Sequence, residues 1–302
     1  MIELAKPLKE NLEGIYSLML TPYNEDRTID WNTYEEYCEF QVAQGVDHLF
    51  AVCGSSEMKE LTLEERIKLA TLTAKHKGDT TIVASANIEP SWFAQVEEVK
   101  RMSQTGVDGI VFITKGFGKN PDRLISYIGE LMTHTDLPVF MYEFPGDQPH
   151  LITGDTYGKL AAMGIQGIKD TTSTIEGICD KIEKKGDSCI IQANMPFLFD
   201  SYKAGARGVM ATPTACGGAF FQRFHEAFMS GDMALAEQRY NEITLLDCAI
   251  DSGFNVSAKY LVQLQGVEGM KAINRGGQQL SPGRLRSLQS FHAWAVAEGL
   301  MK

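Results

Sequence analysis

The sequence has no long apolar run, no basic stripe and no paired cysteine motif. No stretch approaches the roughly 18 apolar residues that a membrane-spanning helix needs, and the opening residues, M-I-E-L-A-K-P-L-K-E, have no apolar centre that would indicate a signal peptide. The formal net charge of −11 argues against a nucleic acid or an anionic membrane as partner, because either would require a basic surface. Six scattered cysteines without a C-x-x-C pair are typical of a reducing compartment. We therefore expect a cytoplasmic protein that acts on a small molecule.

What the sequence contains is a regular alternation of two kinds of segment over its 302 residues. Apolar, strand-like runs occupy residues 15–20, 46–52, 81–85, 109–113, 139–142, 167–169, 189–192 and 208–211. Segments with helical spacing occupy residues 31–44, 63–76, 92–105, 121–135, 155–163, 175–185, 196–203 and 219–229. The strand-like runs are continuously apolar, which indicates that both faces of the sheet are covered.

Eight strand–helix repeats predict an α/β fold, a closed (β/α)8 TIM barrel. An open doubly wound sheet is the alternative, but no glycine-rich dinucleotide fingerprint follows the first strand. After Met233 the pattern is entirely helical, at residues 233–249, 255–264 and 282–300. We expect a barrel with its N-terminal lead-in over residues 1–231 and a C-terminal helical extension over residues 232–302, packed on the barrel.

A lysine and a tyrosine end two consecutive strand-like runs. Lys169 ends the run before Asp170, and Tyr142 ends the preceding run. The chemistry of such barrels lies at the carboxyl ends of the strands. Apolar surroundings lower the pKa of a lysine, so that part of it becomes a free amine nucleophile near neutral pH. The pair therefore predicts Schiff-base chemistry with a tyrosine that carries protons.

Small polar residues follow other strands. The Gly54-Ser55-Ser56 turn can hold a carboxylate with backbone N–H groups and hydroxyls, and Thr171 and Thr212 lie at further strand ends. Each residue also has an ordinary structural interpretation. The lysine can be solvated or ion-paired, the tyrosine can belong to the core, and the turn can simply begin a helix.

Three further features of the sequence bear on other chemistry. Glu57 can be a carboxylate at a helix start. The histidines are isolated, so no metal site is predicted. Gly217-Gly218 after the eighth strand leaves open a sugar-phosphate enzyme.

Several motifs along nearly the whole chain resemble the dihydrodipicolinate synthase / N-acetylneuraminate lyase superfamily of pyruvate-dependent class I aldolases. They are L-T-P-Y at 20–23, G-S-S-E at 54–57, L-T-L-E-E-R at 61–66, P-V-F-M-Y-E-F-P at 138–145, G-I-K-D at 167–170 and A-G-A-R-G-V at 204–209. The resemblance implies that Lys169 forms the Schiff base with pyruvate or another 2-oxo acid, that Tyr142 shuttles protons and that the region of Ser55 binds the carboxylate. It also implies a homotetramer, commonly a dimer of dimers, with no metal and no organic cofactor.

The chain departs from this family in one turn and at three single positions. The family turn usually reads Gly-Thr-Thr-Gly-Glu, whereas this chain has C-G-S-S at 53–56 before the glutamate. Phe117 replaces a relay tyrosine, Asp147 replaces an arginine that grips the second substrate, and Glu143 replaces an asparagine. An aspartate cannot pair with a carboxylate, although a loop shift could bring in Lys115.

We therefore predict a lyase whose second substrate is not aspartate semialdehyde, for example an enzyme that cleaves or dehydrates a 2-keto-3-deoxy sugar acid. The alternatives are a true dihydrodipicolinate synthase and a barrel that binds a 2-oxo acid but has lost turnover.

Overall fold

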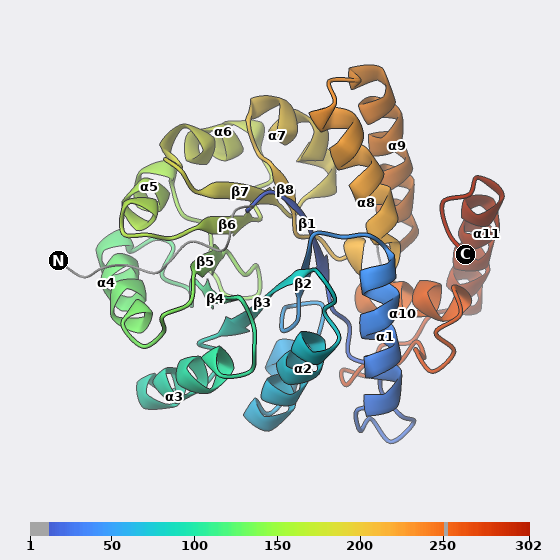
Figure 1. Cartoon of the computed structure of the whole chain (residues 1–302), viewed down its shortest axis with the longest axis horizontal. Helices are drawn as coiled ribbons and strands as arrows, with labels where there is room; N and C mark the ends of the chain where they lie inside the picture. The colour runs from blue at the N-terminus through green and yellow to red at the C-terminus, as the bar shows by residue number, and fades with distance from the viewer. Residues whose placement is uncertain (1–11, 251–252) are drawn as a thin grey trace.

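The chain forms a closed barrel of eight parallel strands, in which each strand pairs with the next and β1 pairs with β8 (Figure 1). A computed structural model describes residues 12–250 and 253–302; the opening residues, on which the expectation of no signal peptide depends, lie outside this part. The strands are β1 (Gly14–Leu18), β2 (His48–Phe50), β3 (Thr81–Ala86), β4 (Gly109–Ile113), β5 (Val139–Tyr142), β6 (Gly167–Asp170), β7 (Cys189–Gln192) and β8 (Gly208–Val209). The predicted (β/α)8 TIM barrel is confirmed, and the alternative prediction of an open doubly wound sheet is wrong.

Helices surround the barrel, as the covered strands require (Figure 1). Those of the barrel are α1 (Trp31–Ala43), α2 (Leu63–Lys75), α3 (Trp92–Ser103), α4 (Pro121–Met132), α5 (Gly154–Ala162), α6 (Ile175–Lys184), α7 (Leu198–Ala204) and α8 (Thr214–Met229). Side chains fix several of their first turns: Thr62 and Glu65 form a reciprocal capping box on α2. Asn120 caps α4, with Pro121 at its first position.

Helix α8 begins five residues earlier than the 219–229 segment that the sequence predicts. Gly217 and Gly218 lie inside it, and Gly217 has non-helical dihedrals that kink it. A pair of glycines disfavours helix formation. The sequence pattern therefore does not predict the first turn of α8. A Cβ on Gly217 would lie 2.6 Å from a methyl carbon of Leu246 on the next helix, so the helices approach closely here. Both glycines are buried.

Three further helices follow the barrel, as predicted: α9 (Met233–Ile250), α10 (Phe254–Leu264) and α11 (Pro282–Ala297). They lie together beside α8 and α1 (Figure 1, orange to red). A buried ion pair joins α10 to the loop after β2: the ammonium of Lys259 lies 2.6 Å from Glu57 Oε1. Lys259 also donates a 2.7 Å hydrogen bond to the Ile273 carbonyl. Glu57 therefore holds the C-terminal extension against the barrel instead of capping a helix.

None of the helices in the described ranges combines the length and the apolar character needed to cross a bilayer.

Candidate active site

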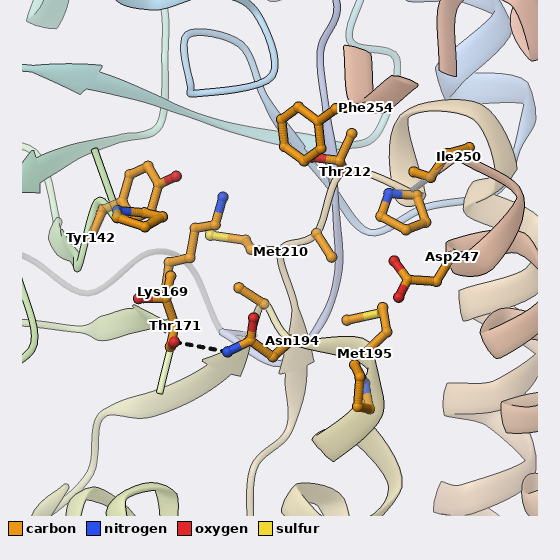
Figure 2. Close-up of a pocket in the computed structure, with 15 residues that line it drawn as sticks. Tyr142, Lys169, Thr171, Asn194, Met195, Met210, Thr212, Asp247, Ile250 and Phe254 are labelled. Atoms are coloured by element: carbon orange, nitrogen blue, oxygen red, sulfur yellow. Dashed lines mark hydrogen bonds between the residues drawn. The ribbon is translucent and has the colours of Figure 1, made fainter. Parts of the chain in front are cut away.

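Lys169 and Tyr142 lie side by side at the carboxyl ends of adjacent strands. In the β5–β6 pairing, Tyr142 is the register partner of Lys169. The Lys169 ammonium lies 4.2 Å from the centroid of the Tyr142 ring and 5.7 Å from that of Phe50. Figure 2 shows the lysine amine and the tyrosine hydroxyl pointing toward the same space. The structure therefore brings together the two residues that the sequence singles out.

The electrostatic surroundings of Lys169 favour its neutral amine. Its side chain is only 5% exposed, and none of the ion pairs found among the described residues includes it. Burial lowers its pKa from 10.5 to about 8, and the nearby Cys53 thiol opposes this shift slightly. Lowering a lysine pKa by this amount increases the free amine at pH 7 by a few hundredfold. A buried amine of this kind is suited to nucleophilic attack on a carbonyl carbon.

Tyr142 keeps its proton. Burial raises the pKa of its phenol well above the usual range, and the Cys53 thiol adds to the increase. The hydroxyl lies close to Gly54, where an added Cβ would lie 3.2 Å from the phenol oxygen. Position 54 therefore leaves room beside the phenol that a side chain would fill. A protonated phenol beside an amine can donate a proton to an oxygen that develops on the attacked carbon.

A cavity of about 320 Å³ opens beside the two residues. Strand ends and loops of the barrel supply one part of its wall, and the C-terminal helices supply the other (Figure 2). Its lining consists of Tyr142, Pro145, Lys169, Thr171, Ala193, Asn194, Met195, Pro196, Met210, Ala211, Thr212, Pro213, Asp247, Ile250 and Phe254. The volume suits a small molecule.

The two serines of the turn after β2 have different environments. Ser56 Oγ accepts a 2.8 Å hydrogen bond from the Cys53 N–H and donates one of 2.8 Å to the Cys53 carbonyl, so its proton is used within the turn. Ser55 Oγ lies 2.8 Å from Thr212 Oγ1, across the barrel mouth. Thr212 also lines the cavity, so the Ser55 hydroxyl reaches the edge of the cavity through this contact.

Thr171 and Asn194 form the side of the cavity near β6 and β7. The Thr171 hydroxyl donates a 2.8 Å hydrogen bond to the Glu143 carbonyl, which leaves its oxygen lone pairs for a ligand. Asn194 donates from Nδ2 to the carbonyls of Thr171 and Thr172, at 2.8 and 2.9 Å. Its carbonyl oxygen is then the amide atom left to face a ligand. This side therefore presents hydrogen-bond acceptors.

A buried cluster of charged side chains lies at the carboxyl ends of β5 and β6. The Lys181 ammonium lies 3.0 Å from carboxylate oxygens of both Glu143 and Asp170. Burial favours the neutral amine of Lys181, but the two carboxylates outweigh it, so its pKa is raised. Burial raises the pKa of Glu143, and Lys181 opposes that increase. Since Glu143 and Asp170 directly follow Tyr142 and Lys169, the cluster holds the strand ends that carry these two residues.

The other departures from the family pattern lie away from the cavity lining. Phe117 packs edge-on against Tyr127, with ring centroids 5.3 Å apart. Asp147 forms an ion pair of 2.7 Å with Lys59. The Lys115 ammonium lies 3.2 Å from the Ile88 carbonyl, so this lysine does not replace the missing arginine in the cavity.

Sequence reasoning missed the contribution of the C-terminal helices. Asp247, Ile250 and Phe254 carry no motif and lie far along the chain from Lys169. Their only sequence signal is membership of a helical segment after the eighth repeat. Within the described residues, no group of three or more histidine, cysteine, aspartate and glutamate side chains is arranged to hold a metal ion.

Comparison with known proteins agrees with this architecture. The model of the dihydrodipicolinate synthetase family matches residues 11–276. The chain is 25% identical over 226 residues to the 4-hydroxy-tetrahydrodipicolinate synthase of Shewanella pealeana, which covers 74% of this chain and 77% of that protein. It is also 25% identical to the enzyme of the same name from Phocaeicola vulgatus, over 95% of this chain and 97% of that one.

Solved structures share the fold at lower identity. YagE of E. coli K12, a prophage protein of the dihydrodipicolinic acid synthase family in complex with pyruvate, has a TM-score of 0.84 at 21% identity, with 96% of this chain and 100% of that one covered. CdNal of Clostridium difficile, in complex with mannosamine, has a TM-score of 0.86 at 16% identity, with 94% and 99% covered. The family match, which spans most of the sequence, is decisive: the chain belongs to the dihydrodipicolinate synthetase family and is a lyase of the class I aldolase type.

Proposed function

We propose that the enzyme forms a Schiff base between Lys169 and pyruvate or another 2-oxo acid, and that it makes or breaks a carbon–carbon bond from that adduct. One observation carries the proposal: a buried amine with a pKa of about 8, outside every ion pair found in the described ranges, shares a cavity with a protonated phenol. The pyruvate complex of YagE supports the choice of keto acid.

The chemistry needs only these two side chains and the substrates. The Lys169 amine adds to the keto carbon, Tyr142 donates a proton to the departing hydroxyl, and water leaves as the iminium forms. The Tyr142 phenolate then takes a proton from the neighbouring methyl carbon and gives an enamine, whose carbon attacks an aldehyde while Tyr142 returns this proton to the new alkoxide. Addition of water then releases the product and regenerates the amine. The reverse sequence cleaves the same bond, and loss of a hydroxyl from the adduct would give dehydration.

The carboxylate of the keto acid would lie at the other side of the keto carbon. Ser55 and Thr212 supply two hydroxyls 2.8 Å apart at the barrel mouth. Hydroxyls and backbone N–H groups bind a carboxylate without a basic side chain. We assign carboxylate binding to this pair, with Gly54 as the close-packed position beside the phenol and Thr171 as an acceptor for the substrate.

Two other functions have their own supporting observation. The curated relatives are named 4-hydroxy-tetrahydrodipicolinate synthase, which favours that activity. The absence of a side chain at Gly54 and the packing of Phe117 against Tyr127 favour a keto-acid-binding barrel with reduced turnover, because neither position offers Tyr142 a hydroxyl. A cytoplasmic homotetramer, built as a dimer of dimers, remains our proposal for the location and assembly, which fractionation and sedimentation would test.

Reductive trapping tests the Schiff base. Incubation with pyruvate and borohydride should add one reduced pyruvate unit to the peptide that contains Lys169, as seen by mass spectrometry. The Lys169→Ala variant should lose the label, whereas Lys115→Ala should keep it. A label on another lysine, or none at all, would refute the proposal. Release of pyruvate from keto acids, measured separately, distinguishes the lyase from the binding protein.

A further inference from the structure

The turn after β2 ends at a residue with an unusual backbone conformation. The Glu57 N–H donates a 3.0 Å hydrogen bond to the Gly54 carbonyl, which closes a turn with Ser55 and Ser56 at its centre. Glu57 has φ and ψ angles of 62° and 36°, in the left-handed region that is rare for residues other than glycine. Such a conformation costs free energy and persists where surrounding contacts hold it. The contacts of the Glu57 side chain therefore bear on the shape of the whole turn.

The C-terminal part of the chain holds both oxygens of the Glu57 carboxylate. Oε1 accepts a 2.6 Å hydrogen bond from the ammonium of Lys259 on α10, and Oε2 accepts one of 2.9 Å from the backbone N–H of Arg275. The Lys259 ammonium also donates a hydrogen bond to the Ile273 carbonyl, at 2.7 Å. The side chain of Lys259 is 0% exposed and that of Glu57 is 7% exposed, so water and salt screen this ion pair little. One buried ammonium thus joins α10, the segment that follows it and the turn.

Two other residues of the turn lie beside the reactive site. Ser55 Oγ lies 2.8 Å from Oγ1 of Thr212, which lines the cavity. A Cβ on Gly54 would lie 3.2 Å from the phenol oxygen of Tyr142. Because these residues and Glu57 belong to one short turn, a shift of the Glu57 backbone would also shift the Ser55 hydroxyl.

The turn has hydrogen bonds that do not involve Glu57. The Thr21 hydroxyl donates a 2.8 Å hydrogen bond to the Ser56 carbonyl, and Ser56 Oγ bonds with both the N–H and the carbonyl of Cys53. All of these bonds lie within the barrel part of the chain. Loss of the ion pair should therefore displace the turn without unfolding it, and the effect should appear in what Ser55 binds.

We propose that Glu57 and Lys259 are positioning residues: their ion pair sets the turn after β2 so that the Ser55 hydroxyl meets the carboxylate of the bound keto acid. The proposal rests on the proposed Schiff-base function and extends it to two residues that do not line the cavity. Lys169 and Tyr142 stand on β6 and β5, outside this turn. Disruption of the ion pair should therefore weaken recognition of the carboxylate and leave the reaction of the amine with the ketone nearly unchanged.

Pyruvate and pyruvamide provide the test, because they share a ketone and only pyruvate has a carboxylate. The rate of borohydride trapping on Lys169, measured against the concentration of each compound, gives a half-saturating concentration and a maximal rate. Glu57→Gln combined with Lys259→Met removes both charges together, so that no unpaired charge remains buried. This double variant should raise the half-saturating concentration of pyruvate about tenfold, because it weakens a hydrogen bond to a charged group. The half-saturating concentration of pyruvamide should change less than about twofold, because pyruvamide offers no charged acceptor. The maximal rates should stay near those of the wild type.

A second variant and a matched control complete the experiment. Glu57→Gln alone should show the same selective effect on pyruvate, and circular dichroism shows whether each variant is folded. Lys271→Met is the control, because it breaks an exposed ion pair between the C-terminal part of the chain and the barrel, in which Lys271 Nζ lies 3.0 Å from Glu25 Oε1. This control should leave both half-saturating concentrations unchanged.

Three results would overturn the proposal. They are an unchanged half-saturating concentration of pyruvate in a folded variant, an equal rise for pyruvate and pyruvamide, and failure of both variants to fold, since the ion pair would then serve the fold alone. Each leaves the Schiff base standing as long as the wild type traps pyruvate on Lys169. A wild type that does not trap pyruvate would remove the proposed function as well.

Discussion

Replacing Lys169 with methionine should make the protein more stable at neutral pH while it abolishes imine formation. The lysine is 5% exposed, and its pKa falls from 10.5 to about 8 because the folded protein disfavours the ammonium. A difference of about 2.5 pKa units corresponds to about 3 kcal/mol of unfavourable interaction in the folded state at pH 7. Methionine has similar length and no charge, so the free energy of unfolding should rise by up to this amount, less any loss from imperfect packing.

The pH dependence of this gain provides the sharper measurement. Between pH 8 and 10.5 the unfolded lysine still holds a proton that the folded lysine has released, so wild-type stability rises with pH through this window. By about pH 9.5 the wild type should recover about 2 kcal/mol, and the advantage of the variant should shrink by the same amount. All other titrating groups are shared and cancel in the difference.

Urea unfolding at about pH 7 and pH 9.5, followed by circular dichroism, measures both quantities. Lys159→Met, at an exposed position on α5, is the control and should change the free energy of unfolding by less than about 0.5 kcal/mol at either pH. A Lys169→Met variant that is less stable than the wild type at pH 7, or whose difference from it is independent of pH, would show that the amine is not held in an unfavourable environment.

Three further results should follow from the same geometry. The initial rate of reductive trapping on Lys169 should rise about fivefold between pH 7 and 8 and level off above about 9, since the free amine is the nucleophile and its pKa is about 8; a midpoint near 10.5 would contradict the burial argument. Tyr142→Phe should slow turnover by about 10²- to 10⁴-fold while the adduct keeps its mass, measured by steady-state kinetics and mass spectrometry; unchanged turnover would exclude proton transfer by the phenol. Lys181→Met should destabilise the fold by about 3–5 kcal/mol in urea, because it leaves two buried carboxylates without their cation, whereas Lys184→Met on the exposed side of the same helix should change stability by less than about 0.5 kcal/mol.

The barrel and the adjacency of Lys169 and Tyr142 could be predicted because both follow from local pattern. Continuous apolar runs identify strands that are covered on both faces, and parallel strands bring their carboxyl ends to one rim. Tyr142 and Lys169 end consecutive strands, so their adjacency in the structure needs no information beyond the order of the strands. The early start of α8 escaped prediction because Gly217 and Gly218 weaken the helical pattern there.

Residues that meet only through the tertiary fold could not be assigned. Glu57 precedes a helical segment in the sequence, yet its carboxylate pairs with Lys259, 202 positions later. The two serines of the β2 turn look equivalent in sequence, and only their hydrogen bonds show that Ser56 closes the turn while Ser55 meets Thr212. Asp247 and Phe254 reach the cavity through the packing of α9 and α10, which no spacing in the chain reveals.

The division of the cavity between two parts of the chain has a consequence for how such enzymes diversify. The amine and the phenol stand on β6 and β5, whereas Asp247, Ile250 and Phe254 stand on helices that follow the eighth repeat. Substitutions in this one terminal segment can therefore change the lining of the cavity without altering the two strands that carry Lys169 and Tyr142. Exchange of this segment between relatives in the laboratory can change the cavity lining in the same way. The exchanged segment must keep the buried Lys259, because this residue pairs with Glu57 of the barrel.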